Sequence, residues 1–159
     1  MSFERNLHYD ATETERRASN TVLMARVEEI DAEKARIRVS AAEIESAWIP
    51  FSSSRAGPDR TWHAPEPGEQ IVLVVPCGDL NNAVYVGSVY QDDYPAPAHD
   101  VDVSLTQWQD GAEQRYDRKQ HQWTLSLPAE GMIRLEVGGS SLTMTRDRIT
   151  LSSPRIELN

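Results

Sequence analysis

The sequence contains only one cysteine, Cys77, among its 159 residues. A single thiol excludes a disulfide within the chain and a cysteine-based metal cluster. No apolar run approaches the roughly 20 residues that a helix needs to cross a bilayer. The first residues also lack the apolar core of a secretory signal peptide. We therefore expect a protein that is made and assembled in a reducing cytoplasm.

Positive charge is scarce as well. Lysine and arginine number 16 against 25 aspartates and glutamates, which gives a net charge of −9. This balance repels phosphate backbones and opposes the counterion release that drives nucleic-acid binding, so no nucleic-acid partner is expected. A basic amphipathic helix that would bind a membrane surface is also missing. Any meeting with a membrane is therefore expected to be a mechanical or a surface contact.

Recognisable catalytic and metal-binding motifs are missing too. The sequence has no phosphate-binding loop, dinucleotide fingerprint or Gly-x-Ser-x-Gly elbow. Asp92 and Asp93 are adjacent, but they lie in a turn-rich segment where aspartate normally bonds the local backbone. The histidines are isolated from one another and from the cysteine: His8, His63, His99 and His121. We predict no catalytic residue, no metal site, no cofactor and no enzymatic activity.

The apolar residues that are present form short alternating runs between clusters of Gly, Pro, Asp and Ser, which is typical of an all-β protein. Five or six short strands within residues 21–97 predict a small barrel. These strands are expected at 21–27, 35–40, 48–51, 68–76 and 83–90. The polar residues 1–20 precede the barrel and are expected to form an amino-terminal arm.

Pro95 and Pro97 interrupt the strand pattern and mark the expected end of the barrel. Residues 98–124 are interpreted as a transition segment. Within it, Asp110-Gly111 lies between Trp108 and Tyr116, which predicts a β-hairpin with a primed turn.

Residues 125–159 carry the more diagnostic pattern, because pairs of aliphatic residues alternate with polar ones. Leu142, Ile149 and Ile156 are spaced by seven residues, and polar connectors separate them. Such a regular repeat of a short strand and a turn, here called a rung, is typical of a β-solenoid or an intertwined prism. Ordinary strands of a larger sandwich remain the alternative interpretation.

Short strands with one apolar face are not stable alone, and no second sheet remains in the chain to cover them. Three copies of the chain would bury one another's apolar stripes around a common axis. We therefore predict a homotrimer whose carboxy-terminal shaft is an intertwined trimeric β-helix or β-prism. The expected trimer core consists of Ile133, Leu135, Val137, Leu142, Met144, Ile149, Leu151, Ile156 and Leu158.

Six short motifs carry a resemblance to a known family. They are Ala-Trp-Ile-Pro at 47–50, Ser-Arg-Ala-Gly at 54–57, Arg-Thr-Trp-His-Ala-Pro at 60–65, Gly-Glu-Gln-Ile-Val-Leu at 68–73, Gly-Asp-Leu at 78–80 and Gly-Ser-Val-Tyr at 87–90. With them the chain resembles the phage baseplate assembly protein V family, the central spike of P2-like contractile tails. The motifs cover roughly residues 21–117, and the rung pattern continues the resemblance to residue 159.

The resemblance implies an OB-type barrel followed by a three-stranded β-helix, in agreement with the reading of the residues. It implies a place at the centre of the baseplate, in a virion or tail-like particle, where the spike attaches to the tail hub protein and nucleates baseplate assembly. It also implies that the spike pierces the bacterial outer membrane when the tail sheath contracts.

One feature departs from that family. Several members end in an apex that binds iron through His-x-His, and no two histidines of this sequence are two residues apart. We therefore expect a spike without its own metal-bearing tip, which a separate PAAR-like tip protein would cap at the carboxy-terminal end.

An OB-type carbohydrate- or protein-binding module with a β trimerisation tail is the alternative function, because OB barrels use exposed aromatic rings as binding platforms. Large rings also seal barrel ends or subunit contacts. Trp62 is accordingly a possible subunit contact.

Overall fold

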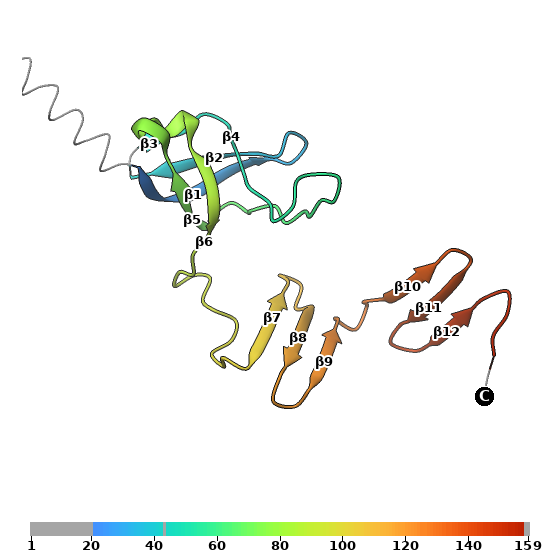
Figure 1. Ribbon diagram of the computed structural model, residues 1–159. Coiled ribbons are helices and arrows are strands. Elements are labelled where there is room, and N and C mark those ends of the chain that lie inside the picture. Colours follow the sequence, from blue (N-terminus) through green and yellow to red (C-terminus); the bar gives the residue numbers. More distant parts are fainter. Residues whose placement is uncertain (1–20, 43, 158–159) are drawn as a thin grey trace, which may run out of the picture. The chain divides into compact units, whose positions relative to one another are not determined.

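The computed structural model describes residues 21–42 and 44–157, and their regular structure is almost entirely β (Figure 1). The expected arm, residues 1–20, lies outside the described residues. Two compact units divide the chain, the first ending at Pro95 and the second beginning at Ala96. The part of the chain that the structure describes contains no α-helix, which confirms the all-β prediction.

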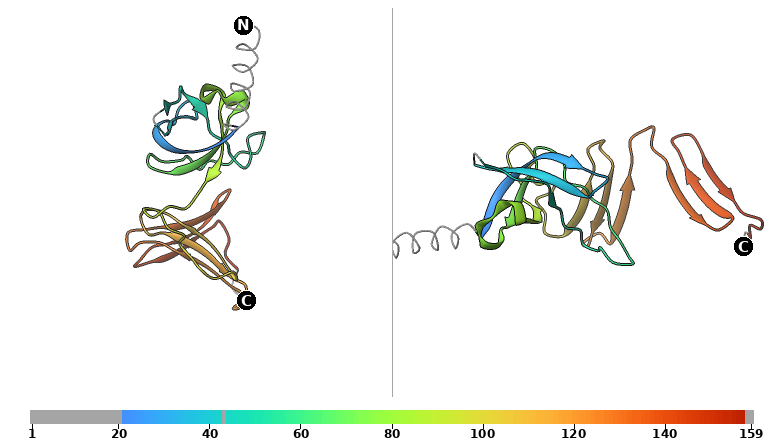
Figure 2. Two further views of the ribbon diagram at one scale, coloured as in Figure 1. Left: turned by 90° about the vertical axis from the view of Figure 1, so that its left-hand side faces the viewer. Right: turned by 90° about the horizontal axis from the view of Figure 1, so that it is seen from above.

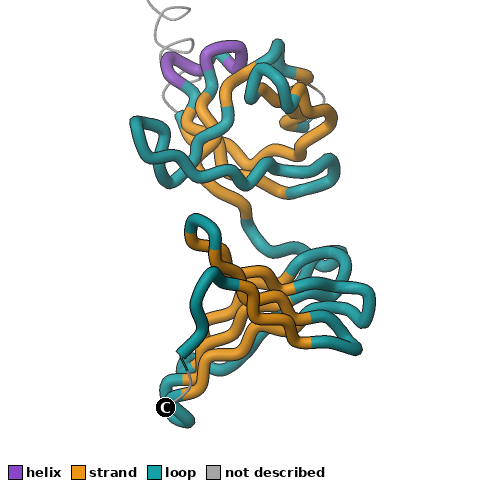
Figure 3. Tube along the Cα trace, turned by 90° about the vertical axis from the view of Figure 1, so that its right-hand side faces the viewer, coloured by secondary structure: helices purple, strands orange, loops and turns teal. Residues whose placement is uncertain are grey.

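The first unit is a curled antiparallel sheet. Its strands are β1 (Val22–Asp31), β2 (Arg36–Ala41), β3 (Ile44–Glu45), β4 (Ile49–Pro50), β5 (Gln70–Val74) and β6 (Val84–Ser88). The sheet order is β3-β2-β1-β5-β6, and β4 also pairs with β2. The sheet curls until β4 and β6 come into contact, so that it forms a small barrel (Figure 3).

Two β-bulges help the sheet to curl. The pairing of β1 with β2 shifts between Val27 and Glu29, which leaves Glu28 without an opposite residue. The pairing of β5 with β6 shifts between Val72 and Leu73, which leaves Val86 extra. A bulge bends its strand and increases the local twist, and this favours closure of a short sheet.

The barrel core follows from the period of two along each strand. Alternate residues of β1, β2 and β5 point inward, and the outward neighbours on β2 are Arg36 and Arg38. The core cluster consists of Ala25, Val27, Ile37, Val39, Ile49, Ile71, Leu73, Val75 and Ala83. The buried core of the described chain is thus concentrated in the first unit, with Ala112 the single buried apolar residue of the second.

Ser46 is a polar side chain within this apolar interior, only 3% exposed. Its backbone N–H donates to the carbonyl oxygen of Val39 at 2.9 Å. Its Oγ accepts a hydrogen bond from the backbone N–H of Val39 at 3.0 Å. Ser46 thereby bonds both the N–H and the carbonyl group of Val39. It lies directly after the short strand β3.

Two single-turn 3₁₀ helices, η1 (Pro76–Gly78) and η2 (Leu80–Asn82), connect β5 to β6. The Asp79 carboxylate accepts the backbone N–H of Asn81 at 3.0 Å. The Asn81 side-chain oxygen in turn accepts the backbone N–H of Ala47 at 2.9 Å. This connection therefore ties the β5–β6 loop to the segment before β4.

The second unit contains two three-stranded antiparallel sheets, each a simple meander. One is formed by β7 (Val103–Gln107), β8 (Glu113–Asp117) and β9 (Gln122–Ser126). The other is formed by β10 (Ile133–Val137), β11 (Ser140–Met144) and β12 (Ile149–Ser152). In Figure 2 the strands of the last sheet, orange to red, lie side by side.

The hairpin expected around Asp110-Gly111 joins β7 to β8, but the prediction of a two-residue primed turn is wrong. The Trp108 N–H donates to the Ala112 carbonyl at 2.9 Å, so residues 109–111 form a three-residue loop. Gly111 adopts a φ of 87°, and Asp110 accepts the Ala112 N–H at 3.0 Å. Glycine in the left-handed region is what three-residue hairpin loops require.

The prediction of a further short strand at Ile156 is also wrong. Residues 153–157 belong to no strand, so the seven-residue spacing describes β11 and β12 and then stops. Pro154 has no backbone N–H to donate to a further ladder, which explains why the meander ends at β12. Leu158, the last residue of the expected core, lies outside the described residues.

The Ser46 contacts generate a prediction about the barrel. Ser46→Ala leaves the Val39 N–H without its side-chain acceptor in the interior, and we expect a loss of about 1–3 kcal/mol in the free energy of unfolding. The midpoint of the urea-induced unfolding of the barrel measures this loss of stability. Ser104→Ala, on an exposed position of β7, is the control and should change stability by less than about 0.5 kcal/mol. Equal effects of the two variants would contradict the role given to Ser46.

Candidate assembly interface

The sheet of β10, β11 and β12 has one apolar face. Register pairs Leu135 with Leu142 and Leu142 with Leu151, so these three side chains form a row across the strands. A second row pairs Ile133, Met144 and Ile149 in the same way. Residues two apart on a strand point to the same side. The apolar face therefore consists of Ile133, Leu135, Val137, Leu142, Met144, Ile149 and Leu151.

The opposite face of this sheet is polar. Arg134, Thr143 and Thr150 form one row across it, and Glu136 and Ser141 belong to the next. Arg134 Nε lies 3.0 Å from a carboxylate oxygen of Glu136, so the charges on this face are paired along β10. The sheet thus has one polar face and one aliphatic face.

The apolar face is uncovered in the single chain. Val137 is 83% exposed, Ile149 68% and Leu135 61%. Contiguous aliphatic surface of this kind on a folded chain marks an interaction site. The structure therefore brings seven of the nine residues expected in the trimer core to one exposed face.

A shallow groove of about 310 Å³ runs along the apolar face. Leu135, Leu142 and Leu151 line it together with Ile156, which follows the last strand. Ser140 and Ser153 close one part of the groove through a hydroxyl–hydroxyl hydrogen bond of 2.8 Å. Ile156 therefore adjoins the same face, although it does not form the rung that its spacing predicts.

The sheet of β7, β8 and β9 is also two-sided, but its uncovered face is aromatic. Tyr116 and Trp123 are direct partners across β8 and β9, and both rings are exposed. The reverse face carries charge, including Arg115, whose guanidinium lies 3.8 Å from the Asp117 carboxylate. The pairing of these two rings was not predicted from the sequence. Alternation of Trp123 with Leu125 is the signal that would have found it.

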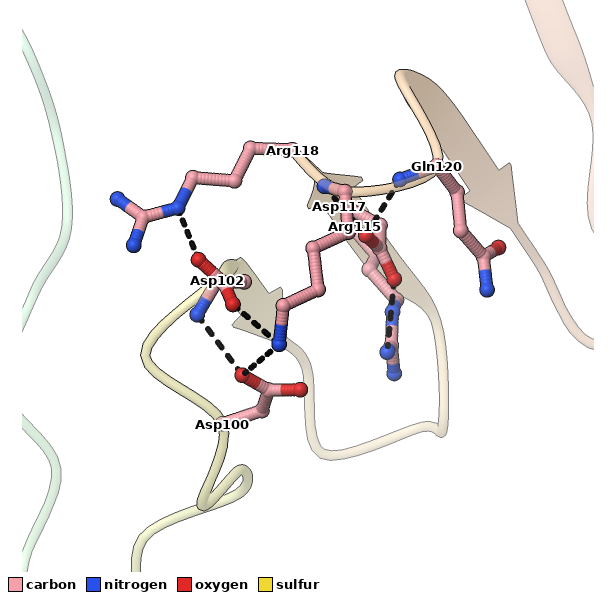
Figure 4. Close-up of polar contacts among 7 residues, drawn as sticks. Asp100, Asp102, Arg115, Asp117, Arg118 and Gln120 are labelled. Carbon is pink, nitrogen blue, oxygen red and sulfur yellow. Dashed lines mark hydrogen bonds and ion pairs between the residues drawn. The ribbon is translucent and has the colours of Figure 1, made fainter.

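A network of ion pairs fixes the turn between β8 and β9 against the segment before β7 (Figure 4). The Asp102 carboxylate accepts from Arg118 Nε and from Lys119 Nζ. The Asp117 carboxylate accepts the backbone N–H groups of Lys119 and Gln120, each at 3.0 Å. The hydrogen bond to Asp102, followed by the charge of Asp100, raises the pKa of Lys119. These charges therefore serve local structure.

Trp62 lies in the long loop between β4 and β5, and its ring is exposed. The ring meets Phe51 edge-on, with centroids 5.5 Å apart. The Thr61 hydroxyl organises the loop, because it hydrogen-bonds to the Ser53 and Ser54 hydroxyls at 2.6 and 2.8 Å. This irregular loop is therefore internally bonded and presents Trp62 at the surface.

A cavity of about 320 Å³ lies beside the same loop. Its lining consists of Ser52, Ser53, Ser54, Thr61, His63, Tyr85 and Val86. The hydroxyls of Ser53 and Ser54 are engaged by Thr61, so neither is arranged as a nucleophile toward His63.

The described ranges offer no cluster of three or more His, Cys, Asp or Glu side chains with which to hold a metal ion. Within the same ranges, the structure has no helix with the length and apolar character of a membrane span. What these residues offer is surface for assembly: an aliphatic sheet face, an aromatic sheet face and a displayed tryptophan.

Two comparisons with known proteins agree with this picture. A family model described as the type VI secretion system/phage-baseplate injector OB domain matches residues 23–90, which is nearly the whole barrel. The spike protein of Escherichia phage P2 is 29% identical over 153 residues, an alignment that covers 91% of this chain and 71% of that protein. The barrel is thus similar to an injector OB domain, and the similarity to a spike protein extends over most of the chain. By these comparisons the chain resembles the spike proteins of phage baseplates.

Proposed function

We propose that this chain is the structural central spike of a contractile phage tail or tail-like particle, and that it works as a homotrimer. The observation that carries the proposal is the uncovered aliphatic face of β10–β12. Leu135, Val137 and Ile149 are each more than 60% exposed in the single chain, and three identical copies would supply one another with cover. The relationship to a phage spike protein supports the same conclusion.

The length of the strands favours three walls around the axis of the oligomer, where each wall is the β10–β12 sheet of one copy. A strand of five residues is about 17 Å long, so three such strands set as a triangle lie about 5 Å from the centre. This is half of the roughly 10 Å that separates packed sheets, and one aliphatic side chain fills it. Four walls would leave a hollow centre, whereas two walls would leave the strand ends open.

In this arrangement the trimer core is Ile133, Leu135, Val137, Leu142, Met144, Ile149 and Leu151, with Ile156 and Leu158 beyond the last strand. Each such side chain contributes on the order of 1.5–3 kcal/mol when fully buried. A column of them gives a stiff shaft, and stiffness is what a device that pierces an outer membrane requires. The aromatic face with Tyr116 and Trp123 adds to the core of the trimer.

The barrel then serves as the attachment domain of the spike. It attaches the trimer to the tail hub protein at the centre of the baseplate and so nucleates baseplate assembly, with Trp62 as a subunit contact. A separate PAAR-like tip protein caps the carboxy-terminal end, where Ile156 follows the last strand. Assembly takes place in the bacterial cytoplasm, contact with the outer membrane is transient, and no catalysis is assigned.

Two neighbouring residues of β12 test the trimer. Leu151 belongs to the apolar face and Thr150 to the polar face, so Leu151→Arg places a charge in the proposed core while Thr150→Arg leaves it in solvent. We expect light scattering to give three times the 17.9 kDa chain mass for the native protein and for Thr150→Arg, and a monomer for Leu151→Arg. A monomeric native protein, or a trimer that tolerates Leu151→Arg, would contradict the proposal.

The place in the particle is tested separately. We expect antibodies against the barrel to label the centre of the baseplate in electron micrographs of the tails produced by the genome that encodes this chain. Supplying only Leu151→Arg should yield particles that do not infect or kill, while Thr150→Arg restores activity. Purified tails that lack the chain altogether would refute the assignment.

The hydroxyl-lined cavity next to Trp62 favours a second candidate, an OB-type carbohydrate-binding module with a β trimerisation tail. Under that function, glycan binding should be lost in Trp62→Ala but retained in Leu151→Arg, since the cavity lies in the barrel. For a spike we expect no glycan binding by the native trimer in titration calorimetry. Saturable binding that depends on Trp62 would favour the module.

A further inference from the structure

A charged network joins two segments of the second unit that are distant in the sequence (Figure 4). Asp102 lies just before β7, whereas Arg118 and Lys119 follow β8 in the turn to β9. The Asp102 carboxylate accepts from Arg118 Nε and from Lys119 Nζ. The Arg118 N–H also donates to the carbonyl oxygen of Asp102 at 3.0 Å. The turn therefore holds Asp102 through its side chain and its backbone together.

The Asp102 carboxylate is the centre of this network. Its side chain is only 11% exposed, whereas Arg118 is 62% exposed and Lys119 67%. An ionised carboxylate that is withdrawn from water needs charged partners. The two cations, in contrast, remain well hydrated. Removal of the carboxylate charge therefore frees the segment before β7, while the two cations lose little.

Charge rather than apolar packing holds the segment before β7. Val101 is 86% exposed, so its side chain contributes little buried surface. The Asp100 carboxylate accepts the Asp102 N–H at 2.9 Å, and the Asp100 carbonyl oxygen accepts the Val103 N–H at 3.2 Å. A carboxylate oxygen of Asp100 also lies 4.0 Å from Lys119 Nζ. The attraction between these charges weakens as salt screens them, because the cations are exposed.

The chain that leads into this segment is short and rich in proline. Gln91 and Tyr94 form an isolated β-bridge at the end of the first unit. Residues 95–99 follow with the sequence Pro-Ala-Pro-Ala-His, and they belong to no helix or strand. Proline-rich segments are extended and semi-rigid at about 3.1 Å per residue, so residues 95–99 span about 15 Å and residues 95–102 would span about 25 Å. The length of the joint between the two units therefore depends on whether residues 100–102 stay on the sheet.

We propose that Asp102, Arg118 and Lys119 form an electrostatic strap, which holds residues 100–102 on the β7–β9 sheet and so keeps the joint short. With the strap closed, the joint is limited to the proline-rich residues 95–99. With the strap open, residues 100–102 lengthen the joint, whereas the sheet persists because its own backbone pairing starts at Val103. High ionic strength opens the strap and low ionic strength closes it. The inference concerns the second unit and the chain that leads into it, and it does not rest on the function proposed above.

Hydrogen exchange of the full chain, resolved by mass spectrometry, tests the strap. Asp102→Asn keeps the size of the side chain and removes its charge. We expect the backbone amides of residues 100–103 to exchange at least about fivefold faster in this variant than in the native chain, because the segment opens locally. Asp93→Asn makes the same change of charge on the exposed turn between Gln91 and Tyr94. It is the control and should leave the exchange of residues 100–103 unchanged.

Salt supplies a second measurement, which the native chain itself can give. Between about 0.1 M and about 1 M salt the Debye length falls from about 10 Å to about 3 Å. Exchange at residues 100–103 should then rise at least about threefold in the native chain and hardly at all in Asp102→Asn. Equal exchange in the native chain and in Asp102→Asn would overturn the proposal, and so would exchange in the native chain that does not respond to salt. Faster exchange throughout β8 and β9 in Asp102→Asn would overturn it as well, because Asp102 would then stabilise the whole sheet.

Discussion

The structure depends on one constraint: a sheet that is apolar on one side must have that side covered. The barrel meets it within one chain, since its bulges bend the sheet until the inward side chains meet around a common centre. The sheets of the second unit are three-stranded meanders with strands of four or five residues. They cannot curl over themselves, so their apolar side faces outward. Under the proposed function, assembly with other copies completes the core of this half of the chain.

The strand alternation predicted much of the fold because it is a local property. The inward positions of β2 and β5, such as Ile37 and Ile71, follow from period two, and so does the shared face of Leu135, Leu142 and Leu151. What escaped prediction depends on the backbone. Asp110-Gly111 suits both a two-residue and a three-residue loop, and the choice is made where Trp108 bonds to Ala112. Ile156 has the correct spacing, but Pro154 interrupts the ladder before it.

The candidate site was predictable in its composition and less so in its extent. Seven aliphatic residues of the expected core share one face, whereas the aromatic pair Tyr116 and Trp123 was not singled out because the two residues belong to different strands. A row of valines on the outer wall of the barrel was missed for a related reason. Val22, Val74 and Val84 are ordinary residues within their strands, and only the register of β1, β5 and β6 reveals them as one surface.

The meander connectivity of the second unit has a consequence for how such proteins change over generations. Each strand in its two sheets pairs only with the strand before or after it in the chain. A duplicated or deleted hairpin therefore alters no other ladder, and it leaves the barrel's pairing untouched. Length can consequently vary in steps of one hairpin. Under the proposed function, this gives natural selection a simple way to match the reach of a spike to the thickness of a cell envelope.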